Sequence, residues 1–178
     1  MHAGEKQLVM TNSDYPADMS KHVRDPKIFA KNGRYYMVQG ARDCESKGCV
    51  LLFESEDLMT WKYFDRIAPE EKFGYMWECP DLFEVDGQEI LIACPQGVPK
   101  SGHDYQNVYQ CGYFPIEMDF ENKKYKLGEF HELDKGFDIY ATQTFLDENG
   151  RRILIGGWEF LMRIMTMMQQ WNMIGSMH

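Results

Sequence analysis

The chain has 178 residues, 28 acidic and 19 basic, and its net charge at pH 7 is −9. This length is typical of one domain, and an apolar content of 44% excludes a disordered chain. The acidic balance argues against nucleic-acid binding. Membrane insertion is also not expected, because no apolar run approaches the ~18 residues that a spanning segment needs and the first residues lack a secretory signal.

The cysteine count favours a reducing compartment. Five cysteines make an odd number, and no two of them have the spacing of a zinc knuckle. The five histidines are scattered along the chain. The sequence therefore predicts free thiols in a cytoplasmic protein with no metal and no cofactor.

A repeat organises the chain from residue 25 onward. The segment 25–38 recurs at 79–92 and, less closely, at 142–155. The proline, phenylalanine and glycine of the first copy recur 54 residues later: Pro26 and Pro80, Phe29 and Phe83, Gly33 and Gly87. Each copy reads as an apolar strand, a turn with glycine at a position that needs positive φ, and a second apolar strand.

Two more strands are expected in each complete copy. The expected ranges are 48–55 and 61–64 in the first copy, and 109–114 and 124–130 in the second. Four antiparallel strands repeated in register are typical of a β-propeller blade, whereas a β-sandwich gives no reason for such a repeat. The chain holds about two and a half blades, too few to close a ring of about four to eight. The sequence therefore predicts an all-β propeller fragment that belongs to a longer protein.

Two short segments place carboxylates at equivalent points of the repeat. Arg24-Asp25-Pro26 begins one blade, and Trp77-Glu78-Cys79-Pro80-Asp81 lies at the same place in the next. The innermost strand of a blade faces the central axis, so Asp25 and Glu78 are expected to converge. Paired carboxylates in one pocket are what cleavage of a glycosidic bond requires.

These segments resemble glycoside hydrolase family 32. Segment 24–26 is similar to the family's "RDP" motif, and 77–83 to its "EC" motif. Segment 137–145 is similar to its "DFYAPQTF" stretch, with Thr142 where proline is usual. The family comprises invertases, sucrose-6-phosphate hydrolases and fructan hydrolases, and the resemblance implies that this chain is a fragment of a five-bladed β-propeller. The resemblance implies a retaining glycosidase of the β-fructofuranosidase type that acts on a small carbohydrate such as sucrose, sucrose 6-phosphate or a fructan.

The resemblance also implies residue roles. Glu78 corresponds to the general acid/base and Asp25 to the transition-state stabiliser. Four residues are expected to contact substrate: Arg24, Trp77, Asp138 and Tyr140. The family's nucleophile is an aspartate in an "NDPNG"-like segment, which this sequence lacks, so the chain alone is expected to be inactive. Two alternatives remain open: a non-catalytic sugar-binding or interaction fragment, and a related five-bladed arabinan-type glycosidase.

The composition changes near the end of the chain. Residues 158–178 contain one acidic residue, Glu159, and six of the 13 methionines. A consistent choice of synonymous codons for this segment, translated one base out of frame, gives an acidic sequence. That sequence resembles the continuation of the family. The sequence therefore predicts a partial family 32 propeller at 1–157 and a frameshifted, non-native tail at 158–178.

Overall fold

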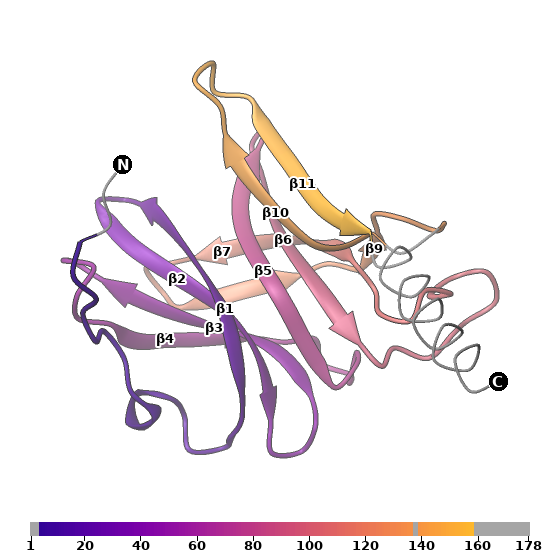
Figure 1. Cartoon of the computed structure of the whole chain (residues 1–178), viewed down its shortest axis with the longest axis horizontal. Helices are drawn as coiled ribbons and strands as arrows, with labels where there is room; N and C mark the ends of the chain where they lie inside the picture. The colour runs from indigo at the N-terminus through magenta and orange to yellow at the C-terminus, as the bar shows by residue number, and fades with distance from the viewer. Residues whose placement is uncertain (1–3, 137–138, 159–178) are drawn as a thin grey trace, which may run out of the picture.

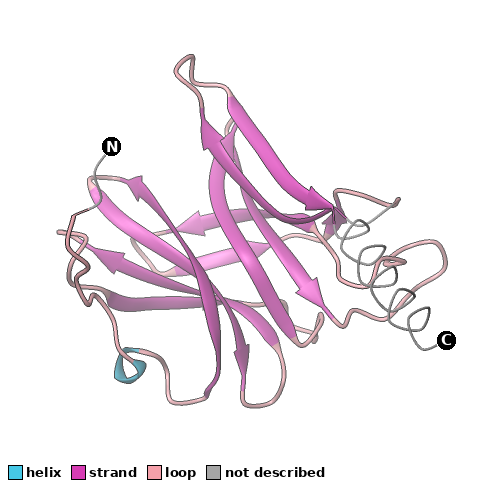
Figure 2. Ribbon diagram, viewed as in Figure 1, coloured by secondary structure: helices cyan, strands magenta, loops and turns pink. Residues whose placement is uncertain are grey.

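The computed structural model describes residues 4–136 and 139–158, and these are almost entirely β-strand. Within these two ranges the helical element is one short 3-10 turn, η1 (Asn12–Asp14). Figure 2 shows how far the strands dominate the described chain. No helix in the described part is long and apolar enough to cross a membrane. Of the tail predicted at 158–178, Trp158 is the last residue of a strand, and residues 159–178 lie outside the described residues.

The strands form three antiparallel sheets in chain order. The first sheet contains β1 (Met19–Lys31), β2 (Arg34–Asp43), β3 (Gly48–Ser55) and β4 (Lys62–Ile67). The second contains β5 (Met76–Val85), β6 (Gln88–Gln96), β7 (Gly112–Asp119) and β8 (Lys124–Leu127), with β9 (His131–Glu132) also paired to β7. The third contains β10 (Ile139–Leu146) and β11 (Arg152–Trp158).

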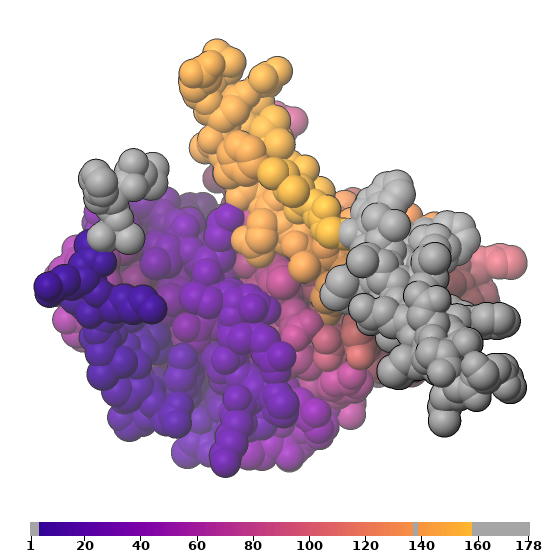
Figure 3. Space-filling view, in the orientation of Figure 1, coloured from indigo at the N-terminus to yellow at the C-terminus, as the bar shows by residue number. Residues whose placement is uncertain are grey.

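The first strands of the three sheets lie side by side. Figure 1 shows β5 between β1 and β10, with the other strands of each sheet leading away from this centre. The β10–β11 hairpin projects beyond the rest of the molecule in Figure 3. A four-stranded sheet, a second sheet in which β9 is a fifth strand, and the two strands of a third lie around adjacent inner strands. This arrangement confirms the propeller fragment that the repeat predicts.

The outer strands of the second sheet differ from their expected ranges. The segment expected at 109–114 becomes β7, which begins at Gly112, and only a bridge between Gln96 and Tyr109 precedes it. The ladder weakens there because Pro95 has no N–H to donate, although its carbonyl still accepts from Gln110 N at 2.9 Å. The segment expected at 124–130 divides into β8 and β9 at Gly128, whose N–H bonds Pro115 O instead.

Each inner strand carries the same β-bulge, and the bulge turns the backbone at the same point of every repeat. At each bulge, two residues of the inner strand face one residue of the partner strand. The bulges lie between Arg24 and Lys27, between Glu78 and Asp81, and between Tyr140 and Gln143. The first residue of each bulge has positive φ: 58° at Asp25, 48° at Cys79 and 53° at Ala141. Bulges of this kind re-aim side chains and are frequent beside active sites.

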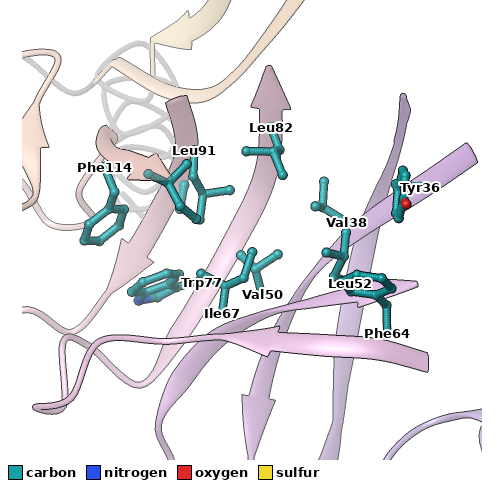
Figure 4. Packing of buried hydrophobic residues seen from close by; sticks show 12 residues of the cluster. Tyr36, Val38, Val50, Leu52, Phe64, Ile67, Trp77, Leu82, Leu91 and Phe114 are labelled. Carbon is teal, nitrogen blue, oxygen red and sulfur yellow. The ribbon is translucent and has the colours of Figure 1, made fainter. Parts of the chain in front are cut away.

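The core that joins the first two sheets is built around Trp77. Its side chain is fully buried and stacks on Phe114, with ring centroids 4.8 Å apart. Figure 4 shows the indole beside Val50 and Ile67 of the first sheet. Gly40 allows this approach, because a Cβ there would overlap the Trp77 carbonyl oxygen.

The buried carboxylate of Asp81 joins the three inner strands just beyond their bulges. The Asp81 side chain is 2% exposed and accepts hydrogen bonds from Thr144 N and Thr144 Oγ1, both at 2.7 Å. Lys27 Nζ lies 3.6 Å from Asp81 Oδ2 and donates to Thr144 O at 2.6 Å. Asp81 therefore links β1, β5 and β10 through a paired and hydrogen-bonded charge, the condition under which buried charge is tolerated.

The bulge at Ala141 gives a test of local backbone strain. Ala141 is exposed, so substitution there changes backbone energetics with little change in packing. We expect Ala141→Val to lower the free energy of unfolding by about 1–3 kcal/mol, since a β-branched residue fits positive φ poorly. We expect Ala141→Gly to remain within about 1 kcal/mol of the parent chain, since relief of strain offsets backbone entropy. Urea unfolding measures both values.

Ala30→Val is the matched control for this experiment. Ala30 is exposed on the regular part of β1, opposite Tyr35, where valine suits a strand. A loss at Ala141→Val no larger than that at Ala30→Val would show that the bulge carries no strain.

Candidate active site

The three residues that precede the bulges meet at one point. Arg24, Glu78 and Tyr140 occupy equivalent positions on β1, β5 and β10. Arg24 Nη1 lies 3.0 Å from Glu78 Oε1, and Tyr140 donates its hydroxyl hydrogen to Glu78 Oε2. One backbone position, repeated three times, thus places a cation, a carboxylate and a phenol in contact.

Glu78 is the centre of this group. Its side chain is 14% exposed, and Oε2 also accepts a hydrogen bond from Gln96 Nε2 at 2.8 Å. Gln96 Nε2 lies 3.2 Å from the Tyr140 hydroxyl, so the amide and the phenol hold the same oxygen together. A carboxylate has about four acceptor positions. Three donors from the chain leave room at Oε1 for a further partner.

Asp25 lies beside Glu78 on the neighbouring strand. Its Oδ2 accepts a hydrogen bond from Cys79 N at 3.0 Å, and Cys79 Sγ lies 3.7 Å from the same oxygen. Gln143 Nε2 donates to Cys79 O at 3.2 Å, which ties the second bulge to the third strand. The strained backbone of the first bulge therefore presents a half-buried carboxylate next to the acid on β5.

The structure brings four of the six predicted site residues together: Arg24, Asp25, Glu78 and Tyr140. Trp77 is not among them. Its side chain leaves the opposite face of β5, is 0% exposed and donates its Nε1–H to Phe73 O at 2.7 Å. We therefore correct its expected role from substrate contact to core packing. Asp138 lies outside the described residues.

Sequence reasoning missed Gln96 and Gln143. Gln96 ends β6, opposite Met76, and no motif marked it as a site residue. Gln143 sits three residues beyond Tyr140, at the far side of its bulge. A comparison of the inner strands in bulge register would have identified Gln143, whereas Gln96 required knowledge of the pairing between β5 and β6.

A hollow of about 500 Å³ lies away from this group. It opens further along the inner strands, on the other side of Asp81, and its lining includes Lys27, Lys31, Phe83 and Arg152. Neither Asp25 nor Glu78 contributes to it. The two carboxylates share a neighbourhood on the surface formed by three strands, rather than this hollow.

Within 4–136 and 139–158, no three histidine, cysteine or acidic side chains are grouped so as to hold an ion. Around Glu78, the site brings together a carboxylate, a guanidinium, an amide and a phenol. These groups suit proton transfer to and from a bound molecule.

Comparison with known proteins identifies the family of the chain. The sequence model of the family described as "Glycosyl hydrolases family 32 N-terminal domain" matches residues 2–177. The chain therefore belongs to glycosyl hydrolase family 32. The match extends through residues 158–177 of the predicted tail, and the frameshift stays a prediction.

Two curated relatives carry the name sucrose-6-phosphate hydrolase. The protein of Bacillus subtilis is 47% identical over 144 residues, which cover 78% of this chain and 30% of the relative. The protein of Staphylococcus xylosus is 44% identical over 142 residues, which cover 79% of this chain and 29% of the relative. This chain therefore spans about 30% of the length of the curated relatives it matches.

Solved structures give the same picture. The family 32 β-fructofuranosidase of Bombyx mori is 42% identical with a TM-score of 0.72, over 80% of this chain and 31% of that one. The sucrose-6-phosphate hydrolase of Lactobacillus gasseri is 38% identical with a TM-score of 0.70, over 80% of this chain and 30% of that one. A variant of the Bombyx mori enzyme was solved in complex with sucrose.

The phenol of Tyr140 gives a pH test of the site. Burial, and then its hydrogen bond to Glu78, raises the pKa of Tyr140 above its ordinary value of 10.0. Stability from a raised pKa is fully present below pH 10.0 and is lost as pH rises through the pKa of the folded chain. We expect Tyr140→Phe to be less stable than the parent near neutral pH, and this difference to shrink above pH 10.0.

Urea unfolding of both chains from about pH 8 to about pH 11 measures the difference. The same series in a Glu78→Gln background is the control. Removal of the carboxylate charge removes one cause of the raised pKa and should weaken the pH dependence. A difference that stays constant through this range would contradict the assignment of a raised pKa to Tyr140.

Proposed function

We propose that this chain supplies the acid/base part of the active site of a retaining β-fructofuranosidase that hydrolyses sucrose or sucrose 6-phosphate. The observation that carries the proposal is Glu78, a carboxylate held by donors on both oxygens and adjacent to Asp25. Sucrose is a small carbohydrate named in the complex of a relative, and sucrose 6-phosphate is named in the relatives' activities.

Each side chain has a proposed role in the reaction. Glu78 protonates the glycosidic oxygen as the bond breaks, and later takes a proton from the attacking water. Asp25 accepts hydrogen bonds from fructose hydroxyls and stabilises the developing oxocarbenium ion. Arg24, Gln96 and Tyr140 orient Glu78 through the contacts already described.

A retaining reaction also needs a nucleophile. That carboxylate must attack the anomeric carbon from a position about 5–5.5 Å from the acid. Among the described residues, the carboxylates that meet at the bulges are Glu78 and Asp25, which already have other roles. We therefore propose that the chain by itself binds substrate and lacks full turnover.

The proposed compartment is the cytoplasm. All five cysteines are free thiols, including Cys94 and Cys111, which lie in contact. Disulfides rarely persist in the reducing cytoplasm, so neighbouring thiols that remain free fit that compartment.

Binding is the first test. We expect the purified chain to give saturation-transfer NMR signals with sucrose and sucrose 6-phosphate, and Asp25→Asn and Glu78→Gln to weaken them. Glu84→Gln is the matched control, since Glu84 lies on the same strand but is exposed and paired with Lys31. Equal signals from all four chains, or none from the parent, would contradict the proposal.

An external nucleophile distinguishes the glycosidase from a sugar-binding fragment. We expect the chain in buffer to release no fructose from sucrose, and added azide to produce fructosyl azide by attack at the anomeric carbon. General acid catalysis contributes about 10²–10⁴-fold, so Glu78→Gln should abolish the azide product while Glu84→Gln retains it. No azide product from a chain that binds sucrose would favour the non-catalytic alternative. Fructose release without azide, lost in Glu78→Gln, would show that the chain holds its own nucleophile.

A further inference from the structure

Three sulfur atoms form a cluster behind the site. Cys94 on β6 and Cys111 just before β7 are fully buried, and their Sγ atoms are 3.5 Å apart. Cys79, the first residue of the β5 bulge, packs against this pair and is partly exposed. Cys79 therefore connects the surface that carries Asp25 and Glu78 with two thiols in the interior.

The strand register places Cys94 and Cys111 directly opposite each other. Ala93 pairs with Gly112 and Gln96 pairs with Tyr109, so the two cysteines occupy the facing position between these pairs. Gln110 N bonds Pro95 O, and Cys111 O accepts from Leu133 N. The cysteines are thus a non-hydrogen-bonded pair, in which Cα atoms lie about 4.5 Å apart. A disulfide requires Cα atoms about 4.4–6.8 Å apart, so closure of the S–S bond needs little backbone movement.

The thiols of Cys94 and Cys111 differ in pKa. The hydrogen bond that Cys94 donates to Cys111 raises the pKa of Cys94 and lowers the pKa of Cys111. Thr142 Oγ1, 3.2 Å from Cys111 Sγ, also lowers the pKa of Cys111. Cys111 is consequently the more readily deprotonated thiol of the two, and as a thiolate it takes the Cys94 proton through this hydrogen bond when Cys94 reacts.

We infer that Cys94 and Cys111 are a reversible dithiol–disulfide site, oxidised by small disulfides such as glutathione disulfide that enter through Cys79. The chemistry is thiol–disulfide exchange, which needs no other oxidant. The small disulfide first exchanges with Cys79, which releases one small thiol and leaves a mixed disulfide. The Cys94 sulfur attacks the Cys79 sulfur, passes its proton by way of Cys111 to the departing thiolate, and releases the second small thiol.

The last step forms the buried bond. Cys111 attacks the Cys94 sulfur, the bond between Cys79 and Cys94 breaks, and Cys79 leaves as a thiol that takes the Cys111 proton. In balance, one small disulfide is reduced to two thiols, and Cys94 and Cys111 lose two hydrogens and gain one S–S bond.

The position of the pair links its redox state to the site. Cys94 lies opposite Glu78 in the β5–β6 ladder, and two residues before Gln96. Cys111 contacts Thr142, two residues after Tyr140. Contraction from 3.5 Å to an S–S bond of about 2.05 Å draws together the two segments that carry the donors to Glu78 Oε2.

Peptide mapping tests the inference on the chain as it exists. The folded chain is equilibrated with glutathione disulfide and glutathione, quenched with acid, blocked with a maleimide and digested with trypsin. Cys79 and Cys94 fall in one tryptic peptide, 73–100, and Cys111 falls in the next, 101–123. A bond between Cys94 and Cys111 therefore joins two peptides, whereas a bond between Cys79 and Cys94 closes a loop within one.

We expect to detect the two peptides joined by a disulfide. Two of the five cysteines should then no longer react with maleimide, while Cys44 and Cys49 should still react after unfolding. The joined pair should be absent from Cys111→Ser and retained in Cys49→Ser, a control at another buried cysteine. Formation should be slower in Cys79→Ser, and an unchanged rate would overturn the entry route. Cys94 and Cys111 that remain thiols in the folded parent chain, or that pair no more often than in urea, would overturn the site itself. This mapping of the parent chain needs no variant to fold.

Discussion

The bulge repeated on β1, β5 and β10 is the constraint on which the site depends. In a regular strand, side chains alternate between the two faces of the sheet. Without the bulges, the side chains of Arg24, Glu78 and Tyr140 would not converge. The extra residue at positive φ, namely Asp25, Cys79 or Ala141, bends each inner strand at the same depth. The three preceding residues then meet. Strained backbone of this kind persists only where surrounding structure enforces it, and the ladders on either side of each bulge do so here.

The repeat also explains how one scaffold position carries different chemistry. At the bulge-preceding position the chain has a guanidinium, a carboxylate and a phenol, while the flanking strands keep a common pattern. The candidate site is formed by the contacts of Arg24 and Tyr140 with Glu78, all three at the same position of the repeated backbone. Cys79 likewise has several contacts from one position. It is the first residue of the β5 bulge, its Sγ lies near Asp25, and it packs against Cys94 and Cys111.

The sequence predicted the architecture because the repeat is visible in residue types. The shared Pro, Phe and Gly positions set two blades in register, and the structure confirms the strands that contain them. It predicted from the same register that Asp25 and Glu78 lie close together, but not that Arg24 would bind Glu78. It misplaced Trp77, since motif adjacency to Glu78 ignores the alternation that sends neighbouring side chains to opposite faces. It missed Gln96 because that residue reaches Glu78 across a ladder whose pairing the sequence does not display.

The small size of the third sheet determines which part of the described chain opens first. It has two described strands, and its contacts with the second sheet include the Asp81–Thr144 bonds and the Tyr140–Glu78 bond. Exposed apolar side chains such as Leu146 and Ile155 show how little of its surface is covered. Local opening starts where few apolar contacts must break. Amide hydrogens of β10 and β11 should therefore exchange with solvent before those of β2 and β3, and the phenol beside Glu78 is released in the same opening.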